Sequence, residues 1–76
     1  MSALDATPIV IGGVVGTVAE HVALMREEGQ TDRCIDYFVG HALGAAVDGW
    51  TAGPAAVTVA AYRADRDARE AAGGAP

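Results

Sequence analysis

The chain has 76 residues, enough for one domain with a small core. Ten acidic and five basic side chains give it a net charge of −5. Because nucleic-acid binding depends on basic side chains that contact phosphates, this balance excludes nucleic acid as an expected partner and disfavours anionic membrane surfaces. The single cysteine, Cys34, cannot form a disulfide within the chain.

The composition indicates a core built from small side chains. Hydrophobic residues make up 51% of the chain but aromatic residues only 5%, so most of the apolar side chains are small. We therefore expect stability to come from backbones that approach closely and from self-association. No cationic segment precedes the apolar run after Pro8, so no secretory signal is apparent and a cytoplasmic location is expected.

The first predicted element is a helix from about Pro8 to Glu28, preceded by a flexible segment over residues 1–7. Thr7 and Pro8 suit the N-cap and the first helical position. Apolar residues then recur at steps of four and three, as on one side of a helix. These are Ile11, Val15, Val18, Val22 and Met25, and the opposite, polar side carries Thr17, Glu20, His21 and Glu28. Gly29 suits the position after a helix end.

Three glycines in this segment leave a second interpretation open. Gly12, Gly13 and Gly16 each cost a helix about 1 kcal/mol relative to alanine. Residues 9–11 could instead form a short strand that turns at Gly12 and Gly13. The helix is preferred because Gly12 and Gly16 lie four residues apart, which gives a helix a narrow side that a second backbone can approach.

The second predicted helix spans about Asp32 to Asp48. Thr31 is a suitable N-cap, and the Asp32 carboxylate interacts favourably with the positive end of the helix dipole. Gly40 and Gly44 form a second pair of small residues four positions apart, and we expect them to face another backbone. In that case Gly44→Leu should lower the melting temperature, since extra volume strains a packed interface.

The third segment begins at Pro54 and is a helix or, over residues 56–62, a strand. Beyond Tyr62, three pairs of opposite charges four residues apart favour a helix. They are Arg63 with Asp67, Asp65 with Arg69, and Arg66 with Glu70. Residues 73–76 are expected to form a disordered tail. The predicted fold is therefore all-α, with one domain over residues 8–72. It is a three-helix bundle, or a helical hairpin plus a C-terminal helix, packed through Gly/Ala faces.

The second helix carries the most suggestive polar group in the sequence. Cys34, Tyr37, His41 and Asp48 follow one another at steps of three, four and seven residues and share one side of it. Cys34 and His41 are two turns apart, about 10 Å, so they cannot form a nucleophile–base pair or bind one metal together. A metal site would need a further ligand, Glu20 or His21, from the first helix. We interpret the group as a polar-aromatic strip at a helix or subunit interface and assign no catalytic, cofactor-binding or metal-binding residue.

These features favour a small helical interaction or oligomerisation module, such as an accessory subunit, without catalysis of its own. Its expected partner is itself, as a homo-oligomer, or a larger protein. Trp50, the single tryptophan, follows the second helix and either covers the end of the bundle or anchors a partner. The predicted interface residues are Gly12, Gly16, Cys34, Tyr37, Gly40, His41, Gly44 and Trp50.

The alternative is a small membrane-associated or membrane-active helical protein with GxxxG-type packing. It rests on the Gly/Val/Ala-rich run over residues 9–19 and on the positive mean hydropathy of the chain. The longest uncharged stretch, residues 6–19, is shorter than the about 20 residues that a spanning helix needs. A membrane is therefore the less favoured partner.

Overall fold

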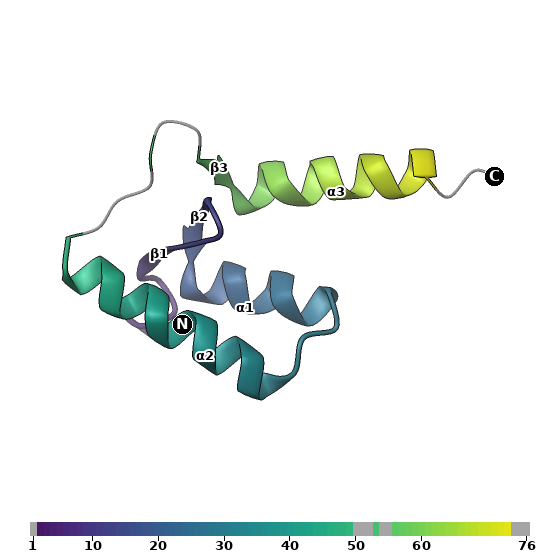
Figure 1. The fold of residues 1–76 in the computed structure, drawn as a ribbon. Coiled ribbons are helices and arrows are strands. Elements are labelled where there is room, and N and C mark those ends of the chain that lie inside the picture. Colours follow the sequence, from purple (N-terminus) through teal and green to yellow (C-terminus); the bar gives the residue numbers. More distant parts are fainter. Residues whose placement is uncertain (1, 50–52, 54–55, 74–76) are drawn as a thin grey trace.

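The computed structural model describes residues 2–49, 53 and 56–73 (Figure 1). Its elements are β1 (Pro8–Ile11), β2 (Val14–Thr17), α1 (Val18–Glu27), α2 (Asp32–Val47), β3 (Val57–Thr58) and α3 (Val59–Gly73). β1 and β2 pair antiparallel, β3 joins β2 in parallel, and the sheet has the order β1-β2-β3. The chain is therefore an α/β protein, and the all-α prediction is wrong.

A tight turn at Gly12 and Gly13 replaces the first part of the first predicted helix. Both glycines have positive φ, 58° and 78°, as a two-residue type I′ hairpin turn requires. Two successive left-handed residues end a helix, whereas the β-branched residues on either side of them favour strands. The strand interpretation of residues 9–11 is confirmed, and the helix start at Pro8 is wrong. Gly12 and Gly16 consequently do not share a helix face.

α1 begins directly where β2 ends, between Thr17 and Val18. The Glu20 backbone N–H donates to Thr17 Oγ1 (3.1 Å) and the Thr17 N–H donates to Glu20 Oε1 (2.9 Å), which together form a capping box. Two carbonyls of residues 2–7 accept hydrogen bonds of 2.9 and 3.1 Å from the first two N–H groups of α1. The helix ends just before Gly29, which has a φ of 80°, so the predicted end is confirmed.

α2 agrees closely with the second predicted helix. Thr31 is its N-cap and accepts a hydrogen bond from the Cys34 N–H (3.2 Å). Asp48 follows the last helical residue, and Gly49 then takes a positive φ of 83°. Trp50 lies outside the described residues, so its predicted role is not tested.

The C-terminal segment combines the strand and the helix that the sequence left as alternatives. β3 is only two residues long and pairs Val57 with Val14 and Thr58 with Val15. Thr58 Oγ1 accepts a hydrogen bond from the Ala61 N–H (3.1 Å), in the manner of an N-cap. From there α3 first packs against β2 and α1, and its C-terminal part then projects beyond the other elements (Figure 1).

Two small apolar clusters hold the elements together. One is centred on Ile9, Val18 and Ala42, and the other on Val14, Leu24 and Val59. Gly16 allows the second cluster to form, because a Cβ added to it would stand 2.5 Å from Val59 Cγ2. Gly16 thus permits a close approach, but from a strand and against a side chain rather than from a helix against a backbone.

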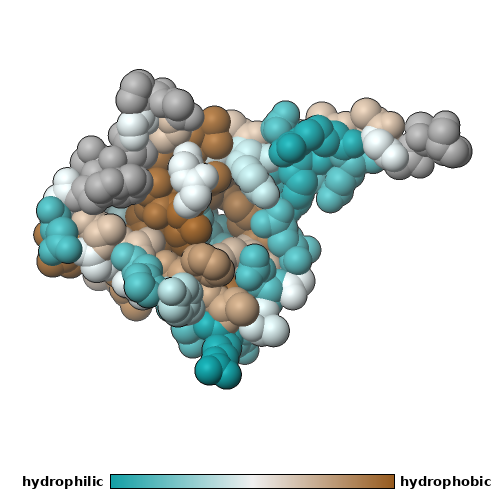
Figure 2. Space-filling view, viewed as in Figure 1, coloured by the Kyte–Doolittle hydropathy of each residue, from teal (hydrophilic) through white to brown (hydrophobic). Residues whose placement is uncertain are grey.

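The polar and apolar side chains are distributed unevenly over the molecule. Figure 2 shows hydrophobic side chains gathered over the hairpin region and hydrophilic ones along α3. Among residues 2–49, 53 and 56–73, no helix combines the length and the apolar character that crossing a membrane requires.

Candidate interaction surface

α2 buries one side and exposes the rest of its surface. Ile35 and Ala42 are buried where the helix packs against β1 and α1. Three large apolar side chains of α2 remain open to solvent. Tyr37 is 62% exposed, Phe38 41% and Val47 87%. Phe38 and Val47 are nine residues apart and therefore point to opposite sides of α2, with Tyr37 between them around the helix. Apolar side chains exposed next to one another, as Tyr37 and Phe38 are, are typical of surfaces that a partner covers.

Tyr37 organises the aromatic part of this surface. Its ring lies edge-on to Phe38 with 5.5 Å between the centroids, and it meets the His41 ring at 4.5 Å. Cys34 is exposed one turn earlier. Cys34, Tyr37 and His41 therefore do share one side of α2, and that side faces solvent within this chain.

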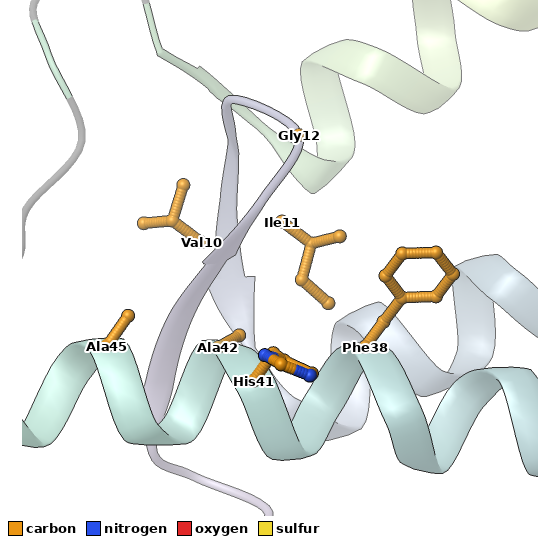
Figure 3. A pocket seen from close by; sticks show the side chains of 7 residues that line it. All are labelled: Val10, Ile11, Gly12, Phe38, His41, Ala42 and Ala45. Atoms are coloured by element: carbon orange, nitrogen blue, oxygen red, sulfur yellow. The ribbon is translucent and has the colours of Figure 1, made fainter.

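An apolar groove lies between the hairpin and α2 (Figure 3). It has a volume of about 320 Å³ and is lined by Val10, Ile11, Gly12, Phe38, His41, Ala42 and Ala45. Figure 3 shows Phe38 and His41 extending from α2 beneath the hairpin side chains. His41 is the one titratable residue of this lining.

A second hollow lies farther along α2. It has a volume of about 430 Å³ and is lined by Gly40, His41, Gly44, Ala45 and Asp48. A Cβ added to Gly40 or Gly44 would meet no atom within 4 Å. Within the chain these two glycines therefore face open space, not the second backbone that their spacing predicts.

His21 lies on the buried side of α1, so its predicted place on a polar side is wrong. It is 2% exposed, and within the described residues its Nε2 atom has no hydrogen-bond partner. The sheet covers this side of α1 because β2 runs directly into the helix. Burial lowers the pKa of His21, while the backbone of Ile9 and Val14 acts more weakly in the opposite direction. A histidine enclosed in this way is neutral at pH 7.

The first helix does not complete a metal site with Cys34 and His41. Glu20 is held in the capping box, where the hydrogen bond from the Thr17 backbone lowers the pKa of its carboxyl. His21 is enclosed in the core. Across the part of the chain that the structure describes, no three His, Cys, Asp or Glu side chains are placed to bind one metal ion.

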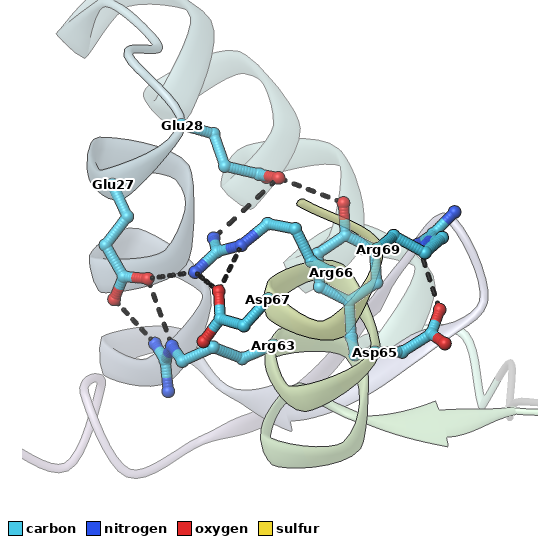
Figure 4. Close-up of polar contacts among 8 residues, drawn as sticks. Glu27, Glu28, Arg63, Asp65, Arg66, Asp67 and Arg69 are labelled. Atoms are coloured by element: carbon cyan, nitrogen blue, oxygen red, sulfur yellow. Dashed lines mark hydrogen bonds and ion pairs between the residues drawn. The ribbon is translucent and has the colours of Figure 1, made fainter. Parts of the chain in front are cut away.

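A polar cluster joins α3 to the end of α1 (Figure 4). Arg63 donates two hydrogen bonds to the Glu27 carboxylate (3.0 and 2.8 Å), and Arg66 donates another (3.1 Å). These bonds lower the pKa of Glu27. The Tyr62 hydroxyl donates to Glu28 (3.0 Å), which raises the pKa of Tyr62.

Two of these arginines have partners that the sequence spacing does not predict. Arg69 pairs with Asp65 at 3.0 Å, as predicted for residues four apart. Arg63 and Arg66 instead reach Glu27 on another helix. Their charges are thereby matched within the chain, so the cluster holds two helices together and offers no cationic surface for an anionic ligand.

No protein-family model, curated protein or solved structure matches this chain. The α2 surface consists of the aromatic side of α2 (Tyr37, Phe38 and His41), the adjoining hollow lined by Gly40 and Gly44, and the groove between α2 and the hairpin.

Proposed function

We propose that this chain is a small, non-catalytic protein-interaction module that binds another polypeptide through the α2 surface. The observation that carries the proposal is the exposed aromatic side of α2, where the Tyr37 ring contacts both Phe38 and His41. Aromatic side chains are enriched in protein interfaces, because they remove much apolar area from water for little loss of conformational freedom.

The chemistry of the groove supports binding rather than catalysis. Its lining consists of alkyl and phenyl groups with one imidazole, that of His41. A histidine acting as a general base is usually oriented by a second polar group. Within the described residues, the contact found for the His41 ring is with the Tyr37 ring and no carboxylate is bonded to it. We therefore assign His41 to the recognition surface.

The membrane alternative receives no comparable support. The apolar run over residues 9–19 on which it rests offers a GxxxG-type contact only if Gly12 and Gly16 lie on one helix face. Gly12 is in the hairpin turn and Gly16 is in β2, where it contacts Val59. The interaction module is therefore the function that we retain.

A photo-crosslinking amino acid placed at Tyr37 tests this function in the living cell. We expect a crosslinked product of discrete mass, because residue 37 lies between Phe38 and His41 at the centre of the α2 surface. The control places the same amino acid at Glu70, which is exposed on α3. Crosslinking should also disappear when His41→Asp, which puts a charge beside residue 37, is added to the Tyr37 variant. Equal crosslinking at positions 37 and 70, or none at either, would refute the function.

A further inference from the structure

We infer that the polypeptide bound at the α2 surface is a second copy of this chain, held by an antiparallel, two-fold symmetric pairing of the α2 helices. This inference rests on the proposed function and names its partner. Two independent features of α2, its charges and its shape, lead to the same arrangement.

The charges on the outer side of α2 specify an antiparallel pair. At about 100° per residue, the side opposite the core is a strip about 100° wide. The strip holds Arg33, Tyr37, Gly40, His41, Gly44 and Asp48, all of them exposed. Its two formal charges have opposite signs and lie at opposite ends. Within the described residues, neither Arg33 nor Asp48 forms an ion pair.

Complementary charge then decides whether the two α2 helices pair antiparallel or parallel. In an antiparallel pair, each Arg33 meets Asp48 of the other copy. In a parallel pair, each arginine would face an arginine, and like charges oppose association. The opposed helix dipoles also favour the antiparallel arrangement.

The shape of the strip gives the same register. Tyr37 projects from α2, with its ring against His41, and the hollow lined by Gly40 and Gly44 follows it along the helix. In the antiparallel pair, Arg33 of one copy stands opposite Asp48 of the other. Tyr37, four residues after Arg33, then stands opposite Gly44, four residues before Asp48. The projecting ring enters the hollow, and two-fold symmetry makes this contact twice.

The size of the contact sets the expected strength. One helix from each copy buries less than the about 1,200 Å² of a standard stable interface, so we expect dissociation in the micromolar range. The chain should therefore be a monomer in dilute solution and a dimer when concentrated.

A charge exchange tests the pairing without weakening the fold. Arg33→Glu places an acidic residue near the start of α2 and Asp48→Arg a basic residue at its end, and both changes suit the helix dipole. In sedimentation equilibrium of the full chain, we expect each single variant to dimerise about tenfold more weakly than the unchanged chain and the double variant to regain most of the loss. Melting curves should show that all three variants stay folded. A chain that is monomeric at several hundred micromolar, or a double variant as weak as the single ones, would overturn the inference.

Cysteine placement tests the direction of the helices independently. In a Cys34→Ser background, Gly40→Cys puts the thiol close to the two-fold axis, so oxidation should give a disulfide-linked dimer. Arg33→Cys in the same background should not, because residue 33 lies about 22 Å along the helix from its counterpart in the antiparallel pair. A disulfide at both positions would indicate a parallel pair and contradict the inference.

The two proposals can fail separately. If the crosslinker at Tyr37 attaches to a different protein and the chain stays monomeric, the dimer is refuted and the interaction module stands. If Tyr37 gives no crosslinked product, the interaction module fails, whatever the concentrated chain does in the ultracentrifuge.

Discussion

The first and last parts of this molecule are held by different forces. The hairpin, α1 and α2 surround a small apolar core that includes Ile9, Val18 and Ala42. α3 contributes one buried residue, Val59, and the partly buried Tyr62, which packs against the apolar cluster of Val59 and donates to Glu28. Its remaining attachment is the Glu27–Arg63–Arg66 cluster. Since apolar burial contributes more to stability than exposed ion pairs, α3 should open locally while the first part stays folded. The comparison therefore separates a core unit, residues 8–47, from an attached arm, α3.

The largest expected effect is at Gly16, where the core unit meets the arm. Gly16→Ala would place a Cβ 2.5 Å from Val59 Cγ2, and we expect it to cost about 1–3 kcal/mol by overpacking. Urea unfolding measures the loss. Adding Val59→Ala should cost less than the sum of the two single changes, because it removes the atom in conflict. Additive effects would show that Val59 does not press on Gly16.

Gly44→Ala is the matched control for that change. A Cβ at Gly44 meets no atom within 4 Å, so in dilute solution the substitution should stabilise the helix, by up to about 1 kcal/mol. The fall in melting temperature expected from the sequence for Gly44→Leu then requires the second copy of the chain. It should appear only at concentrations where the dimer forms.

A smaller effect is expected from pH, and it should be confined to the core unit. Histidine in an unfolded chain has a pKa of about 6.5, and burial lowers the pKa of His21 below that value. Below about pH 6.5 the unfolded state therefore binds more protons than the folded state, so stability falls as pH falls, by at most about 1.4 kcal/mol per pH unit. The fall ends when the folded ring is protonated.

Replacement of the ring isolates this contribution. His21→Leu should flatten the free energy of unfolding between pH 7 and pH 5, as measured by urea unfolding at each pH. Glu20 and Glu27, whose pKa values are lowered from about 4.5, act only at lower pH, where protonation removes their stabilising bonds. An unchanged pH dependence in His21→Leu would mean that the ring is not buried in its neutral form.

The smallest effect is expected from Glu27→Gln, and it should be limited to the arm. The change removes the charge that accepts hydrogen bonds from Arg63 and Arg66. Hydrogen exchange should become faster in α3 and stay unchanged in α2. In 1 M salt, where exposed ion pairs are screened, the variant and the unchanged chain should differ less. Faster exchange throughout the chain would contradict the division into core unit and arm.

The sequence predicts best where the structural signal is local. α2 follows from the Thr31 cap, the apolar repeat and Gly49, all of which act within a few residues of the helix. The helix predicted for residues 8–17 is wrong, because the apolar residues of this segment fit a helical repeat as well as a strand. The two successive glycines, Gly12 and Gly13, were the better evidence, since they are the residues that a type I′ turn demands.

The rest depends on contacts between distant residues. The pairing of β2 with β3 joins Val14 to Val57, and no pattern within either segment indicates it. The same holds for Arg63, which fits a partner four residues away but binds Glu27. For the candidate site, the spacing of Cys34, Tyr37 and His41 correctly predicts a shared side of a helix. The groove beside it could not be predicted, because the hairpin forms its other wall.

Both strands that lead into helices do so without a linker. β2 becomes α1 between Thr17 and Val18, and β3 becomes α3 between Thr58 and Val59. Because no loop residue separates β3 from α3, a change in the direction of the two-residue strand β3 also changes the direction of α3. The 15 residues of α3 span about 22 Å, so a tilt of about 5° at β3 moves the C-terminal end of α3 by about 2 Å. A small shift of β3 relative to β2 therefore becomes a larger displacement at the C-terminal end of α3.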